Sequence, residues 1–190
     1  MVETISPVVH GGRTKTYWFS IALHVLGATA AAAAFGALLG GLGALVGAPW
    51  GSVGALLTAT LAVLYLLREA FGLPIPIFDR KKQVPEWWRT FYSKPVASLL
   101  YGLGLGVGFL TYLTFGTFVV VAAAAFASGD PLIALLLSGT FGAARSLAVA
   151  IATGIDTTDA IEEPRIVATG KFANEIALVI VALGAFLALA

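Results

Sequence analysis

The chain has 190 residues, of which 59% are hydrophobic and 11% charged, and its formal net charge is +1. A soluble domain of this length could not bury so much apolar surface, so the composition predicts an integral membrane protein, and a near-neutral chain without a basic patch is not expected to bind nucleic acid. Cysteine is absent, which excludes disulfides, thiolate metal sites and thiol redox chemistry by this chain alone.

The first 16 residues form a polar tail that carries Arg13 and Lys15, and the tail does not have the pattern of a signal peptide. The apolar stretches that follow are long enough to cross a hydrocarbon core of about 30 Å, which takes about 20 helical residues. We therefore predict an all-α polytopic membrane protein with a single transmembrane domain over residues 17–190. The five expected spans are residues 17–47, 51–72, 97–127, 131–153 and 173–190.

The connections between these spans alternate in charge. Residues 48–50 and 128–130 contain no Lys or Arg, whereas the tail and the segments 73–96 and 154–172 hold most of the cationic residues. The positive-inside rule then places the N-terminus in the cytoplasm and the C-terminus outside, for a multi-pass protein of the cell inner membrane.

The cytoplasmic loop 73–96 contains an aromatic run made of Trp87, Trp88, Phe91 and Tyr92. This spacing places the rings on one face of a short helix, which is typical of an interfacial helix in the lipid headgroup layer. An aromatic anchor is the interpretation we favour. A gate or a docking site is the alternative.

Glycines recur in the first and third expected spans. Pairs such as Gly36 and Gly40, or Gly104 and Gly108, allow two helix backbones to approach closely. We favour tight packing within the molecule. The alternative is that the glycines break the third helix at mid-membrane, where many transporters build a binding site.

Hydroxyl groups follow the glycines of the third span, at Thr111, Tyr112, Thr114 and Thr117. A threonine in a helix often bonds to the carbonyl four residues earlier, which gives these hydroxyls a purely structural interpretation. Their expected position near the centre of the bilayer makes them candidates for a substrate-binding or translocation site.

Arg145 is a charged residue inside the fourth span and completes the candidate site. Charge inside a membrane is costly and predicts function. However, Arg145 is only about 12 Å from the cytoplasmic end of the span by helix rise. It could therefore extend to that interface, or pair with Glu175. We interpret His24, at a comparable depth, as a helix–helix hydrogen-bonding group.

The sequence predicts no enzyme. Four acidic residues lie between positions 156 and 163, but they lack the spacing of a calcium loop, so we predict no metal site. Phosphate loops, zinc-binding helices, Ser/His/Asp arrangements and dinucleotide fingerprints are absent too. We therefore expect no catalytic residues and no cofactor.

Two parts of the chain resemble the transmembrane family of the cytochrome c biogenesis proteins CcdA and DsbD. Residues 101–109 (YGLGLGVGF), the apolar run to Phe126, and residues 138–147 (SGTFGAARSL) are similar to the second half of that family. Residues 24–47 and the second span are similar to helices of its first half. The resemblance implies the LysE-type architecture of inverted repeats, here without the first helix and without both cysteines.

The resemblance also implies a function. We expect a thiol-free membrane transport protein that moves a small solute, within the lipid bilayer, as a homo-oligomer or with a membrane partner subunit. The alternative is a non-transporting accessory or assembly subunit of a membrane complex, linked to cytochrome c biogenesis. A redox protein that borrows its cysteines from a partner is the third interpretation.

Overall fold

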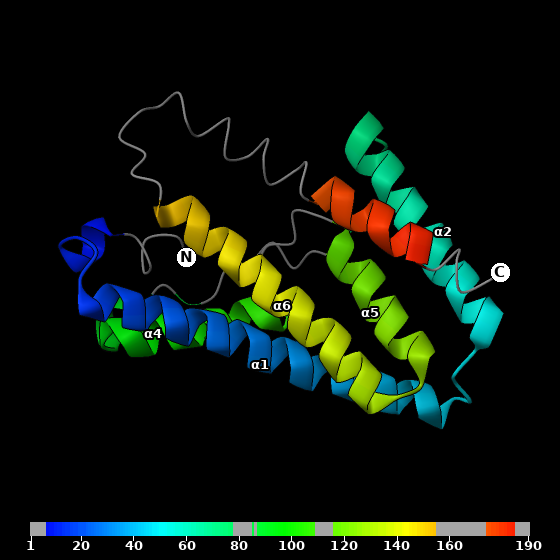
Figure 1. Cartoon of the computed structure of the whole chain (residues 1–190), viewed down its shortest axis with the longest axis horizontal. Helices are drawn as coiled ribbons and strands as arrows, with labels where there is room; N and C mark the ends of the chain where they lie inside the picture. The colour runs from blue at the N-terminus through cyan, green and yellow to red at the C-terminus, as the bar shows by residue number, and fades with distance from the viewer. Residues whose placement is uncertain (1–6, 78–84, 86, 109–115, 155–173, 185–190) are drawn as a thin grey trace.

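The computed structural model describes residues 7–77, 85, 87–108, 116–154 and 174–184, and these form helices and connecting turns (Figure 1). The prediction of an all-α protein is therefore confirmed for this part of the chain. In chain order, the elements are a 3₁₀ turn η2 (Val8–His10), α1 (Lys15–Leu45), α2 (Gly51–Phe71), α3 (Trp88–Phe91), α4 (Lys94–Gly106), α5 (Thr117–Ser128), α6 (Pro131–Gly154) and a helix over Asn174–Gly184.

Three of these helices are long and apolar enough to cross a membrane, namely α1, α2 and the Pro131–Ile151 part of α6. They begin and end within two residues of the first, second and fourth expected spans. The helices Thr117–Ser128 and Asn174–Gly184 are apolar but shorter. Length and composition therefore support membrane association, and orientation stays a prediction.

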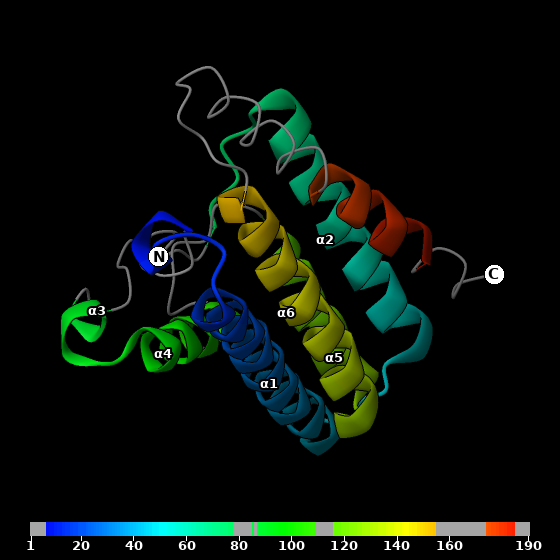
Figure 2. The same ribbon diagram turned by 60° about the vertical axis from the view of Figure 1, so that its left-hand side comes forward.

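The long helix α1 is the axis of the bundle and packs against α4, α5 and α6 (Figures 1 and 2). Its inward face carries mostly small residues, whereas large side chains such as Leu26 and Leu38 are 60% and 58% exposed. This arrangement suits a helix whose outer face meets lipid, because small residues let neighbouring backbones approach.

Glycines make the contacts between α1 and its neighbours close. A Cβ atom added at Gly40 would lie 2.7 Å from the carbonyl oxygen of Asp130, at the start of α6. A Cβ at Gly142 would lie 2.7 Å from the carbonyl oxygen of Ala28. The later position on α1 thus faces the start of α6, and the earlier position on α1 faces a later part of α6. The two helices therefore run antiparallel.

The apolar stretch that we expected to form one span over residues 97–127 instead contains two helices, α4 and α5. The first ends at Gly106, because Gly108 has a φ of +73°, which a right-handed helix cannot contain. Gly102 and Gly106 of α4 face His24 and Ala28 of α1. The helix α5 follows further along α1, where its Phe126 carbonyl faces Gly43. Both short helices therefore run parallel to α1.

A tight turn links α5 to α6. Gly129 ends α5 in a left-handed conformation with a φ of +61°. The Asp130 carboxylate then accepts hydrogen bonds from the backbone N–H groups of Leu132 at 2.7 Å and Ile133 at 3.1 Å. This caps the first turn of α6 and fixes the reversal of chain direction.

The helix α2 lies beside α5 and the Asn174–Gly184 helix (Figures 1 and 2). Their shared apolar cluster consists of Ala62, Tyr65, Val120, Leu178 and Ala182. The aromatic helix expected in the loop 73–96 is the four-residue α3, in which Trp88 packs on Tyr101 at 5.8 Å between ring centroids. Trp87 and Phe91 are 54% and 77% exposed, and their predicted place in the headgroup layer stays a prediction.

Candidate functional site

The end of α4 at Gly106 and the start of α5 at Thr117 lie on either side of the interruption and form the candidate functional site. Residues 109–115 between them lie outside the described residues. Where a helix ends, its last carbonyl groups and first N–H groups have no partner within the helix. In hydrocarbon such groups must be satisfied by other protein groups, because no water reaches them. The structure shows how this is done at both ends of the interruption.

Arg145 of α6 forms a hydrogen bond at the C-terminal end of α4. Its guanidinium Nη1 donates a hydrogen bond to the carbonyl oxygen of Leu105 at 3.3 Å. The same oxygen accepts from the backbone N–H of Gly108 at 3.2 Å. The C-terminal end of a helix carries partial negative charge, so a cation placed there is stabilising.

Glu69 of α2 forms a hydrogen bond at the N-terminal end of α5. Its Oε1 atom accepts a hydrogen bond from the backbone N–H of Gly116 at 3.1 Å, and the residue is 8% exposed. Arg68 donates to the same Oε1 at 3.2 Å and, through Nε, to the Ile75 carbonyl at 2.8 Å. The N-terminal end of a helix carries partial positive charge, so a carboxylate placed there is stabilising.

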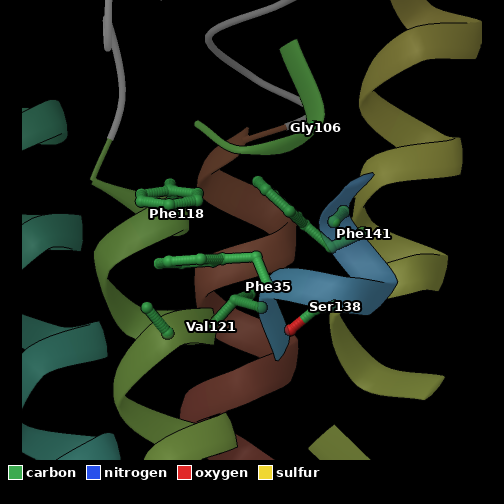
Figure 3. Close-up of a pocket in the computed structure, with 8 residues that line it drawn as sticks. Phe35, Gly106, Phe118, Val121, Ser138 and Phe141 are labelled. Atoms are coloured by element: carbon green, nitrogen blue, oxygen red, sulfur yellow. The ribbon is translucent and has the colours of Figure 1, made fainter. Parts of the chain in front are cut away.

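An apolar pocket lies beside the interruption (Figure 3). The rings of Phe35 and Phe118 stack with centroids 6.0 Å apart and an interplanar angle of 16°. Phe141 of α6 packs on Phe118 at 6.4 Å. The only polar side chain of the lining is Ser138. The full lining is Ala32, Phe35, Gly106, Phe118, Val121, Ala122, Ser138 and Phe141.

The predicted site residues divide into two groups. Thr111, Tyr112 and Thr114 lie outside the described residues, so their role stays a prediction. Thr117 is the first residue of α5, is 5% exposed, and its hydroxyl has no hydrogen-bond partner in the described structure. Arg145 contacts the end of α4. The two described members therefore stand at opposite ends of the interruption.

Sequence reasoning missed Glu69, because it lies near the end of an apolar span and its partner is 47 residues away. The adjacent Arg68 and Glu69 at the end of an otherwise uncharged helix are the signal that could have identified it. An acidic residue there is costly unless something pairs with it.

Comparison with known proteins finds similarity to the methylamine utilization protein MauF. The MauF of Paracoccus versutus is 33% identical over 153 residues, which cover 79% of this chain and 56% of that protein. The MauF of Paracoccus denitrificans is 30% identical over 152 residues, covering 79% and 55%. The MauF of Methylorubrum extorquens is 35% identical over 130 residues, covering 68% and 46%. The chain thus spans about half the length of the curated relatives it matches.

No family model and no solved structure matches the chain. The similarity to MauF corrects the assignment to the CcdA/DsbD family, and with it the expected transport function and the link to cytochrome c biogenesis. That assignment rested on glycine spacing and apolar runs. Such patterns reflect close helix packing in lipid, which unrelated membrane proteins share.

Proposed function

We propose that this chain is a membrane-embedded accessory protein of methylamine utilization, which supports another protein of that process and carries no solute itself. The observation behind the proposal is the similarity to proteins named for methylamine utilization, at 33% and 30% identity over 79% of the chain. An accessory role is the alternative that the sequence itself left open.

The packing of the bundle supports a scaffold. Along α1, glycines face backbone atoms of α4, α5 and α6, so these interfaces are occupied by main chain. Shifting such a contact would separate backbones that fit only at close range. A set of helices joined in this way suits a protein that holds a partner in place.

The proposal includes a multi-pass arrangement with the N-terminus in the cytoplasm. It rests on the alternation of cationic and uncharged connections along the sequence. The parallel course of α1 and α4 supports the multi-pass arrangement, because both helices would then enter the membrane from the same side. The partner is either a second copy of this chain or another membrane protein.

The test is deletion of the gene in the organism that encodes this chain. We expect growth on methylamine to be lost, growth on an unrelated carbon and nitrogen source to be unchanged, and a plasmid copy to restore the first. Uptake of radiolabelled methylamine into the deletion strain should equal that of the parent. One or more methylamine-induced proteins should fall in abundance at unchanged transcript level.

Two results would contradict the proposal. Normal growth of the deletion strain on methylamine would remove the link to methylamine utilization. A loss of methylamine uptake, with all methylamine-induced proteins at normal abundance, would show a transporter in place of an accessory protein.

A further inference from the structure

A polar cluster lies between α1, α4 and α6. One face of α1 is buried at every fourth residue. On this face the carbonyl oxygen of Ala28 lies close to Cβ positions built at both Gly106 of α4 and Gly142 of α6. The face therefore points into the groove between those two helices. Its members at this end are Ser20, His24, Ala28 and Ala32.

The register of the helices brings a serine of α6 to this place. Gly142 faces Ala28 and Ala32, and α6 runs antiparallel to α1. Ser146 is one turn further along α6, so it lies level with His24 and Ala28. Both Ser146 and His24 are 0% exposed. The cluster is therefore enclosed by protein on all sides.

The imidazole of His24 is oriented by α4. Its Nδ1 atom lies 3.2 Å from the carbonyl oxygen of Ser98, which is itself 0% exposed. A carbonyl oxygen only accepts hydrogen bonds, so Nδ1 carries the hydrogen. In the neutral ring, Nε2 is then a bare acceptor, and whatever binds there must donate a hydrogen bond.

Three buried polar atoms of the cluster have no hydrogen-bond partner in the described part of the chain, namely Ser20 Oγ, His24 Nε2 and Ser146 Oγ. The hydroxyls of Thr29 and Thr58 behave differently, because each bonds to the carbonyl four residues earlier. An unsatisfied buried polar group costs about 1–3 kcal/mol, so native proteins supply a partner.

We propose that Ser20, His24 and Ser146 bind one ordered water molecule between α1, α4 and α6. Water donates to Nε2 and still accepts from, or donates to, the two serine hydroxyls, and two to four such bonds are what a buried water makes. A zinc ion is bound by thiolate, imidazole and carboxylate groups, and this cluster supplies one imidazole beside two neutral hydroxyls. The inference is independent of the proposed function.

The chain contains only two histidines, which allows a direct test. In the His10→Gln variant, labelled with ¹⁵N-histidine and placed in lipid nanodiscs, His24 gives the only imidazole signals. We expect the pattern of a ring protonated at Nδ1 and bare at Nε2, together with a magnetisation-transfer peak between this ring and a long-lived water. A ring protonated at Nε2, or a ring without a water contact, would overturn the proposal.

Matched variants identify the other partners of the water. The double variant Ser20→Ala, Ser146→Ala should lose the water peak and keep the Nδ1 tautomer, because the Ser98 carbonyl is untouched. The control Ser52→Ala changes an exposed serine of α2 and should leave both signals unchanged. A water peak that survives in the double variant would show that the serines do not hold the water.

Discussion

The carboxylate of Glu69 accepts a hydrogen bond from the backbone N–H of Gly116 at 3.1 Å, although the two residues lie 47 positions apart. At the other end of the same interruption, Arg145 donates to the carbonyl of Leu105 at 3.3 Å. The N-terminal end of α5 thus meets an anion and the C-terminal end of α4 meets a cation. Each charge is opposite in sign to the partial charge of the helix end that it contacts.

Replacing Glu69 should destabilise the start of α5. In Glu69→Ala the N–H of Gly116 loses its buried acceptor, so we expect a loss of about 1–3 kcal/mol in the free energy of unfolding. Glu69→Gln keeps an acceptor oxygen and should lose less. Unfolding by sodium dodecyl sulfate in mixed micelles measures the difference, and equal losses in the two variants would show that the charge, not the hydrogen bond, is what matters.

Replacing Arg145 should destabilise the end of α4. Arg145→Met removes the cation from the helix end, which costs up to about 2 kcal/mol in a partly buried setting. Arg145→Lys keeps the positive charge and should retain most of the stability. Thermal unfolding of the purified protein in detergent compares the two. A Met variant as stable as the parent would mean that Arg145 does not stabilise α4.

Two adjacent glycines of α1 provide a matched pair. In Gly40→Ala the new Cβ would lie 2.7 Å from both the Asp130 carbonyl oxygen and the Ala134 Cβ, whereas Gly41 has no atom within 4 Å. We expect Gly40→Ala to cost about 1–3 kcal/mol through overpacking. Gly41→Ala should gain up to about 1 kcal/mol through helix propensity. Denaturation of both variants tests this, and similar values would contradict the α1–α6 contact.

The cysteine-free chain allows the orientation to be measured directly. Single cysteines replace the exposed residues Thr16, at the start of α1, and Ser52, at the start of α2. In intact spheroplasts, a membrane-impermeant maleimide should label Ser52→Cys at once and Thr16→Cys only after permeabilisation. Labelling in the reverse order would invert the proposed topology.

The long helices could be predicted because their ends carry local signals. Gly47 and Pro49 separate α1 from α2, Gly72 ends α2, and Pro131 begins α6. Glycine and proline act through the backbone of their own residues, so no knowledge of the fold is needed to interpret them.

The interruption between α4 and α5 could not be placed from sequence alone. The stretch is apolar on both sides, and its glycines are compatible with a continuous, closely packed helix. The end of α4 and the start of α5 are stabilised by hydrogen bonds to Arg145 and Glu69, which belong to two other helices. The sequence alone therefore singles out Arg145, because a charge inside lipid is costly. Its hydrogen-bond partner, the carbonyl of Leu105, can be identified only from the structure.

The central position of α1 also governs how the protein is made. About 110 residues separate the end of α1 from the end of α6, so at about 5–20 residues per second the ribosome needs roughly 5–20 s to deliver the last neighbour. Until α6 is complete, the polar face with Ser20 and His24 lacks one of the two helices that cover it, because α4 is made earlier than α6. We therefore expect the nascent α1 to stay beside the insertion machinery or another protein until α6 arrives.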